Sequence, residues 1–223
     1  MSTSTSDNIY KILEKEILDL KIKPGEPISE NDLCVRFDVS RTPIRSVLQR
    51  LQENGLVHIS PYKTTTVTLL DYDIIGQIIY QRVAVESMVL RDFMRTCSPL
   101  LIEKLRYLIR SSRVLLEGEF ETSEFYALDS ALHEVWFQET RKTYLWECIQ
   151  NSQPNYSRFR MLDIVTIKDF DAIVSEHEKL LDIIIRKDYD AIEPTFEKHF
   201  NGGITRLGDQ VYTTLKNYFI QRD

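Results

Sequence analysis

The sequence predicts a mainly α-helical protein in two parts. Residues 1–70 are expected to form a small helix-turn-helix unit with a β-hairpin, and residues 71–223 an all-α antiparallel helical bundle. Three observations support this fold class. Seven glycines and seven prolines in 223 residues favour long helices over a many-turned β fold. One segment near the N-terminus has marked helix start and stop signals, and from about Asp71 onward every segment has helical periodicity.

Two helices open the chain. Apolar residues recur at helical spacing between positions 9 and 20, and the turn at residues 23–25 ends this first amphipathic helix. Ser29 can cap an acidic first turn, so a second helix is expected to begin there. A tight turn at residues 38–39 leads to the third helix, and the three together predict a helix-turn-helix.

The third helix, within residues 40–57, has the clearest boundaries. Ser40 can cap its first turn, and Pro43 fits a turn in which a missing N–H costs nothing. Gly55 suits the left-handed position after the last turn. The apolar residues at helical spacing predict its buried face: Ile44, Val47, Leu48 and Leu51.

Arginines remain for the outer face of this helix, namely Arg41, Arg45 and Arg50. A DNA major groove admits such a helix, and arginine is the commonest reader of guanine edges. Residues 56–60 and 65–69 are β-branched and alternate, which predicts a β-hairpin with Lys63 at its tip. A hairpin in this place is the wing of a winged helix, from which Lys63 would reach a phosphate or the minor groove.

The charge is unevenly distributed. Residues 1–70 hold equal numbers of acidic and basic side chains, so the formal net charge of −6 belongs to residues 71–223. Residues 36–63 are locally basic. Because only the docking face has to neutralise phosphates, such a protein can bind DNA, and its acidic remainder would help to orient the approach.

Six helices are expected in the C-terminal part, because its helical periodicity is interrupted only at capping and turn signals. Their approximate limits are residues 72–95, 99–117, 121–139, 142–161, 170–187 and 189–217. The three cysteines are far apart, and neither a signal segment nor an 18-residue apolar run occurs. We therefore expect reduced thiols, no membrane insertion and a cytoplasmic location.

Three histidines of the C-terminal part lie on apolar stripes. His133, His177 and His199 each fall on a face that is predicted to be buried, and Asp129 shares the face of His133 four residues earlier. Three imidazoles and a carboxylate that converge from three helices would form a transition-metal site with room for water or a ligand. The alternative is that each is a core histidine satisfied by a carbonyl group or water.

Two charges also lie inside the apolar stripe of the helix at 72–95. Arg82 and Glu86 are four residues apart. They would form a buried ion pair, or Arg82 would hold the carboxylate of a small acid, a task that suits its planar fork. Arg158 and Arg160 are further candidates for the same cavity.

Together these features resemble one family. The segment SRTPIRSVLQRLQENGLV is similar to the winged helix of GntR-type bacterial transcription regulators, and the C-terminal part resembles their FCD (FadR C-terminal domain) type. The resemblance spans about residues 8–217, and six C-terminal helices rather than seven are similar to the VanR-like subgroup. The matching C-terminal residues are Arg82 and Glu86, Asp129 and His133, Glu176 and His177, and His199.

The resemblance implies a homodimer on a palindromic double-stranded DNA operator, with a small organic acid effector beside a divalent metal. Zinc is expected first, with nickel or manganese as alternatives. The implied metal ligands are Asp129, His133, His177 and His199. The implied effector residues are Arg82, Glu86 and Arg160. The implied DNA contacts are Arg36, Arg41, Thr42, Arg45, Arg50 and Lys63.

The expected function is a ligand-responsive transcription regulator, a repressor rather than an activator. One alternative is a metal-dependent hydrolase with an accessory DNA-binding domain, although the sequence has no HExxH motif and no general base is apparent near the expected metal. Another is a DNA-binding architectural protein whose helical part is purely structural, which would bind no metal.

Overall fold

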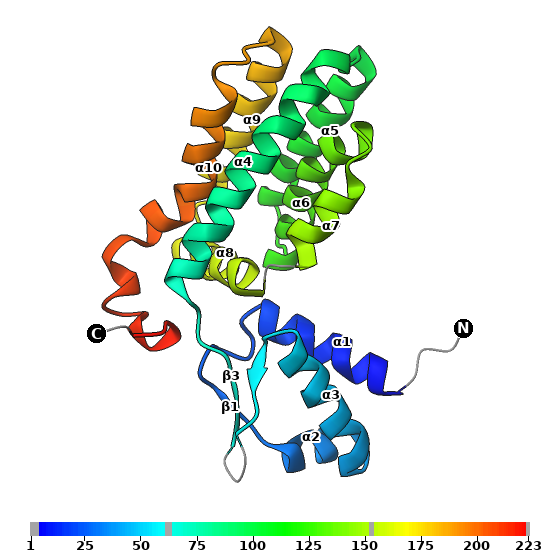
Figure 1. Ribbon diagram of the computed structural model, residues 1–223, viewed down its shortest axis with the longest axis vertical. Helices are drawn as coiled ribbons and strands as arrows, with labels where there is room; N and C mark the ends of the chain where they lie inside the picture. The colour runs from blue at the N-terminus through cyan, green and yellow to red at the C-terminus, as the bar shows by residue number, and fades with distance from the viewer. Residues whose placement is uncertain (1–4, 61–63, 152–153, 222–223) are drawn as a thin grey trace. The chain divides into compact units, whose positions relative to one another are not determined.

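The computed structural model describes residues 5–60, 64–151 and 154–221 (Figure 1). These residues form two compact units. Unit 1 takes in the described residues up to Ile75, those of the segment 154–162, and those from Asp209 onward. Unit 2 takes in the remainder. The sequence-based division after residue 70 places the last two segments of unit 1 in the C-terminal part.

Unit 1 begins with the predicted three helices: α1 (Thr5–Leu18), α2 (Glu30–Phe37) and α3 (Arg41–Glu53). The hydroxyl group of Ser29 accepts the amide of Asp32 at 3.3 Å, so the predicted cap of α2 is confirmed. Ser40 occupies the N-cap position of α3, but its side chain makes no capping hydrogen bond. Gly55 follows α3 with a φ of +68°, as its predicted left-handed position requires.

The buried face of α3 is the predicted one. Its residues are Ile44, Val47, Leu48 and Leu51, and all are fully enclosed. They form one core with the inner faces of α1 and α2, together with Leu56, Val57 and Val67. Burial of this face leaves only the opposite side of α3 accessible to a partner.

A three-stranded antiparallel sheet completes the winged helix. The strands are β1 (Pro27–Ile28), β2 (Val57–His58) and β3 (Thr65–Val67), in the order β1-β3-β2. Pairing of Val57 with Val67 confirms the predicted hairpin. β1 was not predicted, because two residues are too few to produce an alternating pattern. Lys63, the predicted wing tip, lies outside the described residues.

Two sets of contacts explain why later segments belong to unit 1. The guanidinium of Arg158, in the segment 154–162, donates to the carbonyl oxygen of Thr68 at 2.6 Å. Leu70 is bridged to Phe219, because its amide donates to Tyr218 at 2.8 Å and its carbonyl accepts Ile220 at 2.9 Å. The chain that follows the wing is therefore paired with two segments that are remote in sequence.

Seven α-helices follow the wing in the described residues. They are α4 (Tyr72–Thr96), α5 (Pro99–Leu116), α6 (Thr122–Glu139), α7 (Thr143–Asn151), α8 (Pro154–Ile167), α9 (Phe170–Arg186) and α10 (Ile192–Leu207). α5 packs against α6 and α9, and α10 packs against α9, in the bundle of unit 2 (Figure 1). Within the described residues, no helix has the length and apolar character of a membrane span.

The prediction of six helices is therefore wrong. The structure gives the predicted segment 142–161 as two helices, α7 and α8, and the junction between them, residues 152–153, lies outside the described residues. The final helix also ends at Leu207, before the 3-10 turns Gly208–Val211 and Lys216–Tyr218. The resemblance to the VanR-like subgroup was based on six C-terminal helices, and the observed number of helices in the described residues does not support that subgroup.

Candidate metal site and DNA-reading face

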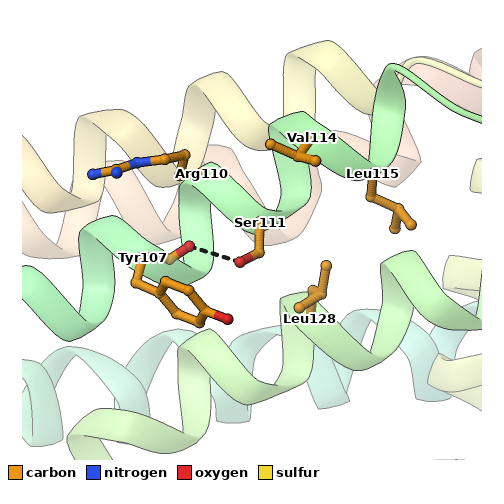
Figure 2. A pocket seen from close by; sticks show the side chains of 6 residues that line it. All are labelled: Tyr107, Arg110, Ser111, Val114, Leu115 and Leu128. Atoms are coloured by element: carbon orange, nitrogen blue, oxygen red, sulfur yellow. Dashed lines mark hydrogen bonds between the residues drawn. The ribbon is translucent and has the colours of Figure 1, made fainter.

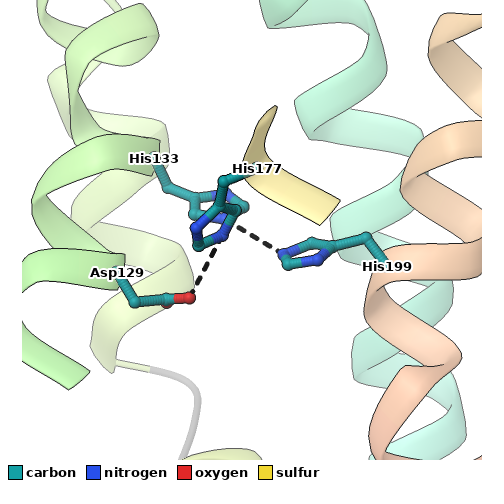
Figure 3. Close-up of side chains that lie close together, drawn as sticks. All are labelled: Asp129, His133, His177 and His199. Atoms are coloured by element: carbon teal, nitrogen blue, oxygen red, sulfur yellow. Dashed lines mark hydrogen bonds and ion pairs between the residues drawn. The ribbon is translucent and has the colours of Figure 1, made fainter. Parts of the chain in front are cut away.

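Four side chains converge inside unit 2 (Figure 3). α6 contributes Asp129 and His133, α9 contributes His177, and α10 contributes His199. All four are buried, and one donor atom from each lies within 4.8 Å of the others. The structure therefore brings together the whole set of metal ligands predicted from the sequence.

Helical periodicity explains how these polar groups reach the interior. Asp129 and His133 are one turn apart, so they share a face of α6. His199 lies between Phe196 and Phe200 on the apolar face of α10, and both phenylalanines are buried. Because the three helices turn their apolar faces toward a common core, the polar members of those faces meet.

The distances suit a metal ion. Nε2 of His133 and Nε2 of His199 are 3.2 Å apart, and Nε2 of His177 is 3.3 Å from a carboxylate oxygen of Asp129. An ion that is about 2.1 Å from each donor requires donors no more than about 4.2 Å apart. Small adjustments of the side chains would therefore complete such a coordination shell.

Two outer carboxylates orient the histidines. An oxygen of Glu86 lies 2.7 Å from Nδ1 of His133, and an oxygen of Glu176 lies 2.8 Å from Nδ1 of His199. Carboxylates accept hydrogen bonds, so each Nδ1 carries the proton and each Nε2 presents a lone pair to the centre. A cation between the two facing nitrogens, which are 3.2 Å apart, would satisfy both lone pairs, so the residues present fit a divalent metal.

His177 gives a further sign of fit. Its Nε2 is buried and makes no hydrogen bond among the described residues, although a carboxylate oxygen of Asp129 lies 3.3 Å away. A buried polar atom without a hydrogen bond is costly, and a metal–nitrogen bond would remove that cost. Carboxylates rather than carbonyl groups accept from Nδ1 of His133 and His199, which favours the metal site over the alternative of core histidines satisfied by a carbonyl group or water.

The local electrostatics favour a neutral imidazole at His133 beside an ionised Glu86. Burial lowers the pKa of His133, although Glu86 opposes this shift. Burial acts to raise the pKa of Glu86, but the charges of Arg82 and His133 outweigh it, and the pKa is lowered. Burial raises the pKa of Glu176 against the opposing charge of Arg206. Neutral imidazole is the form that binds metals.

Arg82 and Glu86 form the buried ion pair that was one of the two interpretations of the sequence. Nε and Nη2 of Arg82 lie 2.7 and 2.6 Å from the same oxygen of Glu86, and the guanidinium covers the ring of Phe200. Arg158 and Arg160 belong to unit 1. A role of Arg160 in the effector site stays a prediction.

The sequence reasoning missed the residues that support His199. Arg206 binds both carboxylate oxygens of Asp163, with distances of 3.1, 3.1 and 2.6 Å, and lies 3.7 Å from Glu176. One signal was available: Arg206 follows His199 by seven residues, two helical turns, and so shares its face. No spacing rule pointed to Asp163, because it lies on another helix.

Changing Glu86 to glutamine is expected to weaken zinc binding about 10- to 100-fold, the usual cost of losing the partner of a metal-bound histidine. The amide keeps the size of the side chain but removes the charge that holds the proton on His133. Competition with a chromophoric chelator measures the affinity. Glu178→Gln, which changes an exposed acceptor of Arg113, is the matched control. Equal zinc affinity in E86Q and the parent would contradict this role.

Unit 1 presents the candidate DNA-reading face. Arg41, Thr42 and Arg45 are exposed on the outer side of α3. Arg41 donates to Asn31 at 3.0 Å, and Arg45 pairs with Glu30 at 3.0 Å. Both partners lie in the first turn of α2, so the two arginines are held near the N-terminal end of α3, where a helix meets base edges in a groove.

The other predicted DNA contacts are placed differently. Arg36 forms two hydrogen bonds with Glu16, which lowers the pKa of that carboxyl group. Arg50 pairs with Asp7 at 2.8 Å. Nine residues are two and a half turns, so Arg50 lies on the side of α3 opposite Arg41. Contacts of Arg36 and Arg50 with DNA stay predictions.

A separate hollow lies between α5 and α6 (Figure 2). Its volume is about 360 Å³. The side chains around it are Tyr107, Arg110, Ser111, Val114, Leu115 and Leu128. None of these is a residue of the metal site, and the lining is largely apolar.

Comparisons with known proteins agree with both units. The family model of bacterial regulatory proteins of the gntR family matches residues 5–67, and the FCD domain model matches residues 77–202. The HTH-type transcriptional repressor RspR of Escherichia coli K12 is 27% identical over 172 residues, 77% of this chain and 75% of that protein. The gluconate operon transcriptional repressor of Bacillus subtilis is 24% identical over 180 residues, 78% of this chain and 73% of that protein.

A solved structure supports the fold. McbR/YncC of E. coli superposes with a TM-score of 0.71 at 17% identity, over 94% of this chain and 99% of that one. The FCD model alone covers more than half of the chain. The winged helix, the helical bundle and these matches show that the chain belongs to the GntR family of bacterial transcriptional regulators, in the group whose regulatory part is an FCD domain.

Proposed function

We propose that this regulator is a metal-containing repressor that binds a palindromic operator as a homodimer and responds to a small organic acid. The main support for this proposal is the arrangement of four side chains. Three imidazoles and a carboxylate converge in unit 2, with Glu86 and Glu176 fixing the protons of two histidines. The repressor names of relatives such as RspR support the direction of control.

The effector is proposed to bind beside the metal through its carboxylate. A bound zinc, nickel or manganese ion would offer positions beyond its four protein ligands to a carboxylate oxygen. Arg82 is paired with Glu86, so an effector carboxylate at this guanidinium would compete with Glu86. Both residues lie on α4, which begins two residues after Leu70 at the end of the wing, so a change in this pair acts on the helix that joins the wing to unit 2.

The homodimer is supported by an exposed apolar stripe on α5. Leu100, Tyr107 and Val114 follow one another at intervals of seven residues and are 79%, 67% and 60% exposed. A twofold axis near Tyr107 would place Glu103 of one copy opposite Arg110 of the other, in both directions. The hollow beside Tyr107 would accept an apolar side chain of the second copy.

The hydrolase interpretation is less well supported by the same geometry. A general base must be able to reach a metal-bound water. Glu86 and Glu176 are the neighbouring carboxylates with the right chemistry, but both are engaged by Nδ1 of a histidine. An architectural protein with a structural helical part would give no reason for converging lone pairs.

The function is tested by selecting DNA from a random duplex library with the zinc-loaded full-length protein. We expect an inverted repeat with half-sites about one helical turn apart. Acetate, lactate, succinate, citrate and gluconate are then titrated into the complex, and one of them is expected to weaken binding by about 5-fold or more. Enrichment of an unrepeated site would contradict the dimer. Unchanged affinity with all five acids would contradict a carboxylate effector.

A further inference from the structure

A chain of polar contacts leads from the metal site to α8. Nδ1 of His199 binds Glu176, whose second oxygen lies 3.7 Å from Arg206, and Arg206 binds Asp163 on α8 with three contacts of 2.6–3.1 Å. The side chains of Asp163 and Arg206 are 4% and 17% exposed, so water screens this pair little. All these residues belong to unit 2.

The guanidinium of Arg206 occupies the space beside Gly202. A Cβ atom added at Gly202 would lie 2.7 Å from Nη1 of Arg206. Glycine within a helix costs about 0.5–1 kcal/mol relative to alanine, and Gly202 is buried within α10. A side chain at this position would therefore require the guanidinium to shift from its place beside Asp163.

A second chain of contacts leads from α8 to the end of the DNA-reading helix. Arg158 donates to the carbonyl oxygen of Thr68 at 2.6 Å and to its hydroxyl oxygen at 3.0 Å. The same hydroxyl donates to the carbonyl of Gly55 at 2.7 Å, and the amide of Thr68 donates to Leu56 at 3.0 Å. Gly55 and Leu56 follow α3 directly. All these residues belong to unit 1.

Burying the charged side chain of Arg158 costs free energy of folding. Its side chain is completely buried, and its described hydrogen bonds go to uncharged oxygens of Pro154, Thr68 and Asn155 rather than to a carboxylate. Burial lowers the pKa of this guanidinium to about 10, which reflects the cost of an enclosed charge. The planar guanidinium holds these oxygens in a fixed arrangement.

We propose that α8 couples the metal site to the DNA-reading unit, with Arg206 and Arg158 as the positioning residues at its two connections. Asp163 follows Arg158 by five residues within the same helix, Pro154–Ile167. A helix moves as a unit because its backbone hydrogen bonds are internal. The inference rests on the proposed function and adds a connection distinct from α4.

Arg206 supplies the two-state element that such coupling requires. It lies between two carboxylates, close to Asp163 and more distant from Glu176. With metal bound, His199 holds Glu176 in place and Arg206 stays on Asp163. Removal of the metal releases His199, and Glu176 can then draw Arg206 away from Asp163. α8 loses its attachment to α10 in this second state.

The test uses full-length protein, zinc-loaded or treated with chelator, and a duplex selected from the random library. Parent protein is expected to differ about 5- to 150-fold in operator affinity between the two states. Asp163→Asn and Gly202→Ala are each expected to bring this ratio within about twofold of one while zinc stays bound. Arg113→Met, which breaks an arginine network between α5 and α9 in the same unit, should keep the parent ratio.

Hydrogen exchange at the amide of Thr68 gives a readout without DNA. We expect zinc removal to speed this exchange in the parent and in R113M, but to leave it unchanged in D163N. Arg158→Lys should remove the coupling as well, and the double variant of Asp163 and Arg158 should show no further loss, because both act in series.

The outcomes separate this inference from the proposed function. If the parent bound the operator equally well with and without zinc, metal-dependent control and the proposed coupling would both be contradicted. A large parent ratio that persists in D163N and G202A would overturn the role of α8 alone. Loss of zinc from D163N would also overturn it, since Asp163 would then act within the metal site.

Discussion

Replacing His177 by alanine is expected to weaken zinc binding by more than about 100-fold. Loss of a residue that only supports a metal ligand lowers metal affinity by up to about 100-fold, and His177 is proposed to be a ligand itself. His177 is the sole ligand from α9, and its buried Nε2 has no other hydrogen-bond partner among the described residues. The three remaining donors would leave a cavity on one side of the ion. Elemental analysis after dialysis against a competing chelator measures the effect.

His58→Ala is the matched control for this experiment. His58 is an exposed histidine in β2 of unit 1, so its loss should leave zinc content at the parent level. Circular dichroism at several temperatures would show that H177A still folds. Zinc content in H177A equal to that of the parent would remove His177 from the site and favour the interpretation of a core histidine.

Arg45→Ala is expected to lower affinity for the selected operator by about 1–3 kcal/mol, or about 5- to 150-fold, while binding to unrelated DNA changes much less. Arg45 lies on the exposed side of α3 with its guanidinium on Glu30. The Arg45–Glu30 pair is exposed to water, so its loss should cost the fold less than about 1 kcal/mol. Fluorescence anisotropy with operator and scrambled duplexes measures both affinities.

Arg186→Ala is a suitable control, because it removes an exposed arginine from unit 2 away from the proposed dimer contact. It should leave operator affinity unchanged, and light scattering at the same concentration should show the same dimer. If R45A distinguished the operator from the scrambled duplex as well as the parent does, the groove assignment would be refuted.

Periodicity predicted which residues face inward, and this was enough to assemble the metal ligands. The four-residue spacing of Asp129 and His133 fixes their common direction in any α-helix. Spacing within one helix says nothing about partners on other helices. Glu86 meets His133 across 47 residues of chain, and Glu176 meets His199 across 23. Those contacts depend on how the helices pack.

The elements of the fold that the sequence did not predict have similar explanations. β1 exists because β3 lies beside it, and a two-residue strand carries no pattern of its own. The start of α8 at Pro154 did have a signal in the proline, but the apolar residues on both sides continued the helical pattern.

The described charged groups around the metal site, which are buried or largely buried, have a definite charge balance. The carboxylates are Glu86, Asp129, Asp163 and Glu176, and the guanidiniums are Arg82 and Arg206. With neutral histidines, their formal charges leave an excess of two negative charges in a poorly hydrated interior. A divalent ion cancels that excess, whereas a monovalent ion leaves one negative charge and a trivalent ion creates a positive one. Valence itself is therefore a basis for selecting the ion, independent of its preferred ligands or geometry.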